Sequence, residues 1–177
     1  MTADTPTTVS ATDLRSLMSR WATGVAVVTA HEGSTDAGMT VNALISVSLN
    51  PPSLLISLTR DADTTPVVER SGTFAVSFLA ADQRALSERF ARAVPSEEKF
   101  SGVPLHRGRT GAALLDACLG TVECRVVSTT LAFDHALFLG EVIGLELGPD
   151  RTPLIFHHSG YAEPDPNGGL RLPPPRR

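Results

Sequence analysis

The sequence is poor in cysteine, and this shortage excludes two classes of protein. Two cysteines in 177 residues are too few for the disulfide framework of a small secreted domain. Cys118 and Cys124 are separated by five residues, a spacing that matches no common zinc site, and no histidine pair completes one. We therefore expect no metal centre and two buried, apolar cysteine side chains.

Excess positive charge and long apolar runs are also missing. The formal net charge is -4, and the arginines are scattered among acidic residues, which argues against a nucleic-acid surface. No stretch reaches the roughly 20 apolar residues that a membrane-spanning helix needs. The polar, threonine-rich segment 1–10 lacks the pattern of a signal peptide. These absences predict a cytoplasmic protein with no nucleic-acid or membrane partner.

Four common catalytic or phosphate-binding motifs are absent. The sequence contains no Gly-x-Gly-x-x-Gly after a strand, no Gly-x4-Gly-Lys, no His-Glu-x-x-His and no Gly-x-Ser-x-Gly. Gly108-Arg-Thr-Gly111 is too short to serve as a dinucleotide loop. A dinucleotide that bound this chain would therefore bind without a Rossmann arrangement.

Composition along the chain predicts one domain with two short tails. The length is that of a single domain, and no internal repeat is found. We place the domain at 12–163, after a disordered segment 1–11 and before a disordered, proline-rich tail 164–177.

Apolar periodicity inside the domain indicates more strand than helix. Helices are expected at 13–21, from a cap at Thr65 to Ser71–Gly72, and at 82–91. Strands are expected at 25–30, 39–49, 54–59, 73–79, 120–130, 136–147 and 153–158. Because the strands come in runs rather than alternating with helices, we predict a mainly β fold with short helices, an antiparallel barrel without long exposed edges.

The segment 39–49 alternates strictly between apolar and polar residues. Its second face carries Thr40, Asn42, Ser46 and Ser48. Such a face fits either solvent or a polar ligand, and the alternation alone does not choose between them.

Several blocks, in order over about 150 residues, resemble the flavin reductase family, the small reductases of two-component flavin-dependent monooxygenases. The blocks are Trp21-Ala-Thr-Gly-Val-Ala-Val-Val-Thr29, Gly38-Met-Thr-Val-Asn-Ala-Leu-Ile-Ser-Val-Ser-Leu-Asn-Pro-Pro52, Gly72-Thr-Phe-Ala-Val-Ser-Phe-Leu79, Arg89-Phe-Ala91, Lys99-Phe-Ser-Gly102, Asp134-His135, Gly140-Glu-Val142 and Pro153-Leu-Ile-Phe156. The resemblance implies an antiparallel split β-barrel of the FMN-binding type and a homodimer with flavin near the subunit boundary.

The resemblance also implies a cofactor site. It places the flavin ring and ribityl chain along the strand that carries Thr40, Val41, Asn42, Ala43 and Ser46. It places the phosphate near hydroxyl groups and the start of the following helix, at Ser57, Thr59 and Thr64. Ala62 stands where a serine is common in the family, which removes one hydrogen bond to the phosphate.

Further site residues follow from the later blocks. Phe90 is expected at the cofactor, and Arg89 and Lys99 would add positive charge there, unless they are ordinary solvated side chains. The expected catalytic residue is His135, on the nicotinamide side. It would either orient the carboxamide or protonate reduced flavin. Two further expected contacts are Tyr161 and His158, the second of which replaces an arginine common in the family.

The implied function is an NAD(P)H-dependent flavin reductase that reduces FMN or FAD and supplies it to a partner monooxygenase. FMN versus FAD, NADH versus NADPH, and flavin as substrate versus prosthetic group stay open. Two alternatives also stay open. One is a split-barrel flavoenzyme that oxidises its own substrate, as pyridoxamine phosphate oxidases do, and the other is a module that binds flavin or haem without turnover.

Overall fold

The computed structural model describes residues 9–164 and 170–171, and most of them belong to antiparallel strands. Residues 1–8, 165–169 and 172–177, which make up most of the two tails expected to be disordered, lie outside these residues. The strands are β1 (Thr23–Gly24), β2 (Ala26–Glu32), β3 (Thr35–Val41), β4 (Leu44–Leu49), β5 (Pro52–Thr59), β6 (Thr73–Phe78), β7 (Leu105–Arg107), β8 (Ala113–Leu115), β9 (Gly120–Ala132), β10 (His135–Leu147), β11 (Ile155–His157), β12 (Gly160–Pro164) and β13 (Leu170–Arg171). The helices are α1 (Ala11–Met18), α2 (Thr64–Ser71), the 3-10 turn η1 (Ala81–Gln83), α3 (Arg84–Phe90) and α4 (Ser96–Phe100).

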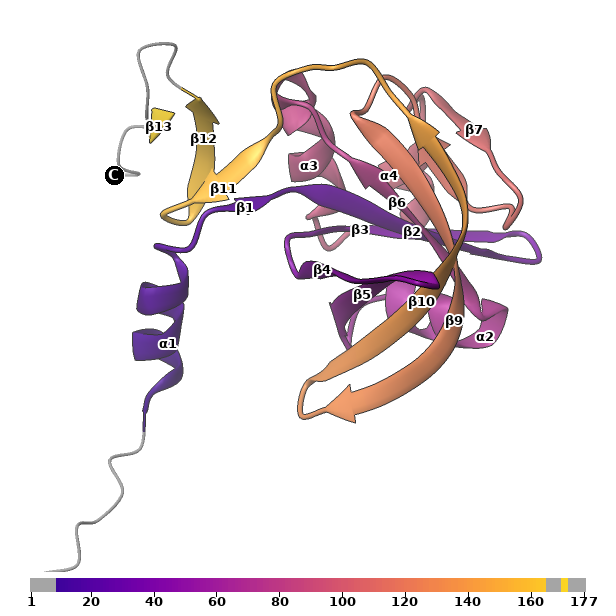
Figure 1. Ribbon diagram of the computed structural model, residues 1–177, viewed down its shortest axis with the longest axis horizontal. Helices are drawn as coiled ribbons and strands as arrows, with labels where there is room; N and C mark the ends of the chain where they lie inside the picture. Colours follow the sequence, from indigo (N-terminus) through magenta and orange to yellow (C-terminus); the bar gives the residue numbers. More distant parts are fainter. Residues whose placement is uncertain (1–8, 165–169, 172–177) are drawn as a thin grey trace, which may run out of the picture.

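The main sheet curls into a split barrel, which confirms the predicted fold class. Its seven strands follow the order β3-β2-β6-β9-β10-β5-β4. The two edge strands, β3 and β4, are consecutive in the chain and are joined only by Asn42 and Ala43. So short a link forces the two edges together, and the sheet must therefore bend round on itself (Figure 1). The split in the barrel thus lies at Asn42–Ala43.

The single strand expected over 39–49 is therefore wrong. Apolar and polar residues do alternate along this segment. At Asn42–Ala43, however, the chain leaves one edge of the sheet and joins the opposite edge. The Ser57 amide donates a hydrogen bond to the Ala43 carbonyl at 3.1 Å, which fixes the link against β5. The exposed apolar side chains of the segment, Ile45, Val47 and Leu49, all lie on β4 after the break.

The barrel interior is filled by large apolar side chains. Phe74, Phe138, Ile56 and Leu58 are fully buried, and α2 covers one end of the barrel with Val67 and Val68. Gly72 ends α2 in the left-handed region, at φ 64°, as the sequence predicted. Thr65 does not cap this helix, because the helix begins at Thr64 and the Thr65 hydroxyl donates to the Thr59 carbonyl at 2.7 Å.

The first helix differs from its expected position. It runs over Ala11–Met18 and is capped by Ser10, whose hydroxyl accepts from the Asp13 amide at 3.1 Å. Trp21 lies beyond its end. Figure 1 shows α1 projecting away from the barrel, and its apolar side chains Leu14, Leu17 and Met18 are exposed.

Two further local expectations, the turn between the long strands and the buried cysteines, agree with the structure. The two long strands β9 and β10 meet across a turn at Phe133–Asp134, and Phe133 adopts a left-handed φ of 57°, a conformation that suits glycine. Both cysteines are free and buried. Among the described residues, no helix is long and apolar enough to cross a membrane.

Glu123 is a buried carboxylate on β9 that fixes the loop between β7 and β8. It accepts hydrogen bonds from the amides of Arg109 (3.0 Å) and Thr110 (2.7 Å) and from the Thr110 hydroxyl (2.7 Å). Burial alone would raise the pKa of Glu123, but these hydrogen bonds together lower it below its ordinary value. The carboxylate therefore stabilises the fold above the ordinary pKa of glutamate, and this contribution is lost as the pH falls through the lowered value.

Replacing Glu123 with Gln is expected to lower the free energy of unfolding by about 1 to 2 kcal/mol at neutral pH, because the amide group cannot accept all three bonds. Urea unfolding at neutral and acidic pH measures the effect. The deficit relative to the original protein should shrink in acid, where Glu123 also becomes protonated. The exposed Glu97→Gln variant is the matched control, and a Glu123→Gln deficit that does not change with pH would contradict this role.

Candidate functional site

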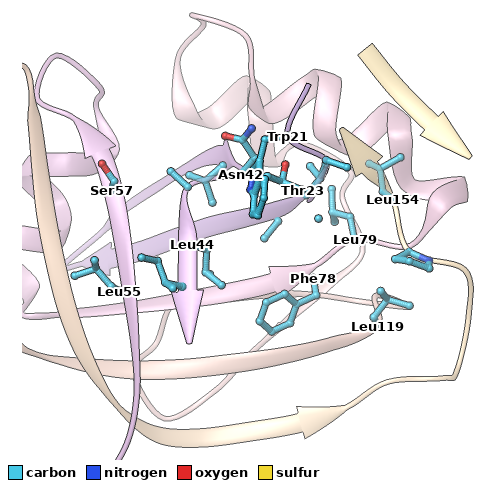
Figure 2. A pocket seen from close by; sticks show the side chains of 18 of the residues that line it. Trp21, Thr23, Asn42, Leu44, Leu55, Ser57, Phe78, Leu79, Leu119 and Leu154 are labelled. Carbon is cyan, nitrogen blue, oxygen red and sulfur yellow. The ribbon is translucent and has the colours of Figure 1, made fainter. Parts of the chain in front are cut away.

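An apolar cleft of about 950 Å³ opens at the split of the barrel. Val41, Asn42, Ala43 and Ser57, four residues that the sequence placed at the flavin, line it. Figure 2 shows Trp21, Thr23 and Asn42 grouped on one side of the cleft. The other walls are mainly aliphatic and aromatic side chains, among them Leu44, Leu55, Phe78, Leu79, Leu119 and Leu154. Such a cleft suits a flat, largely apolar ring system.

One polar atom in this cleft has no partner. The Thr23 hydroxyl oxygen is buried and makes no hydrogen bond within the described residues. Because an unsatisfied buried hydroxyl is costly, a ligand with polar edges would fit here better than a purely apolar one. The chain at Asn42–Ala43 borders the same cleft and carries no bulky side chain at Ala43, so a ring edge can approach the backbone.

A second, more polar cavity of about 800 Å³ lies between the β5–α2 connection and the segment that links α3 to α4. Thr40, Thr59, Thr64, Phe90 and Lys99, five further residues of the predicted site, line it. Strand β5 connects the two spaces, because Ser57 lines the cleft and Thr59, two residues on and on the same face, lines the cavity.

Lys99 is the buried cation of this cavity. Only 7% of the residue is exposed, and its ammonium donates to the Gly38 carbonyl at 3.1 Å. Burial lowers the pKa of Lys99 below its ordinary value, and the nearby Asp63 carboxylate offsets part of this effect. An ammonium group has three donors, so one carbonyl leaves donor capacity for an anion. The cavity therefore fits a phosphate group, and Thr40, Thr59 and Thr64 also line it.

His135 begins β10 beside this cavity. It pairs across the sheet with Thr59, and its Nδ1 lies 2.9 Å from the Asp134 carboxylate. This contact lowers the pKa of Asp134 and leaves Nε2 as the ring nitrogen that a ligand can reach. The Arg60 amide donates to the Asp134 carbonyl at 3.0 Å, which ties the turn to the β5–α2 connection.

Besides His135, four of the predicted site residues line neither space. Arg89 donates to the carbonyls of Glu98 (2.6 Å) and Ser101 and so holds α4 in place. The Tyr161 hydroxyl lies 2.8 Å from that of Ser87, while Ser46 and His158 are exposed. A role of these four residues at the cofactor stays a prediction.

Other lining residues were not predicted from the sequence. Thr23 lies in one of the sequence blocks quoted above. The block therefore held a signal for Thr23, but the sequence analysis did not assign Thr23 to the site. Trp21, which starts the same block, was expected to end the first helix, but it lies beyond that helix and lines the cleft. Asp61, Asp63 and Arg92 line the polar cavity from loops, where no periodicity marks a ligand-facing side chain.

Comparisons with known proteins match almost the entire domain. The family model described as "Flavin reductase like domain" matches residues 18–165. The chain is 40% identical to "Actinorhodin polyketide dimerase" of Streptomyces coelicolor, over 84% of this chain and 84% of that protein. It is 37% identical to "4-hydroxyphenylacetate 3-monooxygenase, reductase component" of Thermus thermophilus, over 81% of this chain and 90% of that protein.

A solved structure agrees with these sequence matches. The NADH:FAD oxidoreductase SgcE6 of Streptomyces globisporus C-1027, in complex with NAD and FAD fragments, superposes with a TM-score of 0.82. The two chains are 34% identical, and the match covers 88% of this chain and 93% of that one.

Proposed function

The chain belongs to the flavin reductase family, and from this premise we propose that it transfers a hydride from a nicotinamide dinucleotide to a flavin held at the split of its barrel. The observation that carries the proposal is the pairing of the apolar cleft at Asn42–Ala43 with the polar cavity around Lys99. A flavin needs both, an apolar space for its rings and a cationic pocket for its phosphate. Strand β5 runs from the cleft to the cavity, with Ser57 lining the first and Thr59 the second.

The protein supplies positioning more than acid or base chemistry to this reaction. A bound flavin would supply the hydride acceptor, and the residues around the split would hold the two rings in contact, which can itself supply much of the rate enhancement. The Asn42 side chain and the backbone around Ala43 hold the flavin edge. The imidazole of His135, oriented by Asp134, faces the nicotinamide. The family resemblance implies that a separate monooxygenase would receive the reduced flavin.

A steady-state assay of nicotinamide oxidation, with added FMN or FAD, tests this function. We expect NADH to be oxidised only when a flavin is present. Oxygen uptake driven by an organic substrate without NADH would favour an oxidase instead. Bound flavin without any NADH oxidation would favour a binding module.

We further propose that the chain is a homodimer, because large apolar side chains remain exposed around the split. Ile45, Val47 and Leu49 project from β4, an edge strand, with 57%, 51% and 86% of each residue exposed. Phe133, at the tip of the β9–β10 hairpin, is 97% exposed. Apolar patches of this kind mark protein–protein contacts. Ile45 also lines the cleft, so a second subunit on β4 would border the flavin site.

Light scattering of the purified protein should therefore give twice the chain mass. Replacing Val47 with Glu is expected to shift the protein toward monomer, because a carboxylate would be buried in the contact. The control is Ala85→Glu, on an exposed position of α3. A fully active monomer, or a dimer that Val47→Glu leaves intact, would contradict the proposed interface.

A further inference from the structure

We propose that the flavin this protein binds best is FAD rather than FMN, with the adenosine half of FAD in the polar cavity. This inference rests on the proposed function, because it concerns the same site. The family description names a flavin without saying which one. The difference between the two flavins lies entirely beyond the first phosphate, so the space and chemistry around Lys99 decide between them.

The cavity is larger than the phosphate of FMN needs. Its volume of about 800 Å³ is close to that of sites that enclose whole drug-sized molecules, about 300 to 1,000 Å³. One phosphate group beside Lys99 would fill only a small part of this space. The remainder lies along the segment between α3 and α4 and has room for a nucleoside.

The wall formed by this segment is apolar. It includes Phe90, Val94 and Pro95, and Met39 adds a further apolar side chain from β3. Phe90 is 1% exposed, and its ring makes an edge contact with that of Phe100 at 5.0 Å, so this part of the wall is fixed. A phosphate and its hydration shell gain nothing from an apolar wall, whereas an adenine ring does.

The charged groups of the cavity also match a dinucleotide. Two cations, Lys99 and Arg92, line it, and FAD carries two phosphates where FMN carries one. Two carboxylates, Asp61 and Asp63, line it from the β5–α2 connection. Carboxylates accept hydrogen bonds from ribose hydroxyls, as in other dinucleotide sites, and the adenosine half of FAD carries a ribose that FMN lacks.

Filling the adenosine space separates the two flavins. Val94→Trp is expected to weaken FAD binding by about tenfold or more, by occupying the space, while FMN affinity stays within about twofold of the original. Ala93→Trp, an exposed position lining the same cavity, is the second filling variant and serves if the first fails to fold. The matched control is Ala85→Trp, on α3 outside the cavity. Dissociation constants for both flavins come from flavin fluorescence titration, and circular dichroism checks the fold.

The inference is supported if the original protein binds FAD more tightly than FMN and only the filling variants lose that preference. Equal affinity for both flavins, or a filling variant that folds and weakens both equally, would overturn the inference while leaving the proposed flavin reductase intact. A protein that bound neither flavin would overturn the proposed function and this inference together.

Discussion

Replacing Lys99 with Met is expected to weaken FMN and FAD binding by about 10- to 100-fold, because the variant loses a charged hydrogen bond to the flavin phosphate. Methionine has a similar length and suits a buried position, so the fold should survive. Titration of flavin fluorescence gives the dissociation constants of both proteins.

Riboflavin provides the control for Lys99, because it has the same ring system and no phosphate. Its affinity should be nearly the same for the original protein and for Lys99→Met. If riboflavin binding fell as far as FMN binding, Lys99 would support the shape of the site rather than contact the phosphate.

The charge of Lys99 also predicts a pH effect. Burial lowers the pKa of Lys99, so the ammonium loses its proton at a lower pH than an exposed lysine does. FMN affinity should therefore fall as the pH rises through this lowered value. The affinity for riboflavin should not follow the same curve.

Replacing His135 with Ala is expected to slow flavin reduction by about 10- to 100-fold at a fixed NADH concentration, less than the roughly 10²–10⁴-fold typical of a general acid or base, because His135 mainly positions the nicotinamide. Equilibrium flavin binding should stay close to that of the original protein. Stopped-flow mixing of the flavin-bound protein with varied NADH separates a weaker nicotinamide affinity from a slower hydride transfer.

Asn42→Leu is the comparison variant for His135→Ala, because the opposite pattern of effects is expected from it. It removes a hydrogen bond at the flavin edge and should weaken flavin binding by about 1 to 3 kcal/mol while the NADH dependence barely changes. If His135→Ala weakened flavin binding as strongly as Asn42→Leu and left hydride transfer unaffected, His135 would belong to the flavin side.

The architecture was largely predictable because most strands carry clear local signals. The long apolar strands around Phe133–Asp134 and the left-handed stop at Gly72 come from residues whose own conformational preferences decide the result. The break at Asn42–Ala43 was not predictable in this way. The alternation continues through it, and only the closing of the sheet by distant strands makes the chain change edges there.

The candidate site was predictable where its residues lie on strands. Val41 and Ser57 line the cleft and Thr59 lines the cavity, and all three lie on strands that the sequence indicates. Arg89 shows why charge alone is a weaker guide, since its guanidinium is bound by the carbonyls at the end of α4. Such contacts depend on the tertiary approach of two helices, which no local pattern records.

Loops and short elements account for most of what was missed. Helix α4, which carries Lys99, and the β7–β8 pair have only five and three residues per element, too few for a periodic pattern. β13 pairs with β12 inside a tail expected to have no structure. In each case neighbouring segments, rather than local propensity, stabilise the element.

The most direct test of the central claim is anaerobic mixing of the flavin-bound protein with one equivalent of NADH, while the absorbance of the flavin and of the nicotinamide is recorded together. Without oxygen, the two signals should fall together, with one flavin reduced for each NADH oxidised, and His135→Ala should slow both equally. A protein that binds flavin in the cleft but leaves it oxidised in the presence of NADH or NADPH would contradict the account.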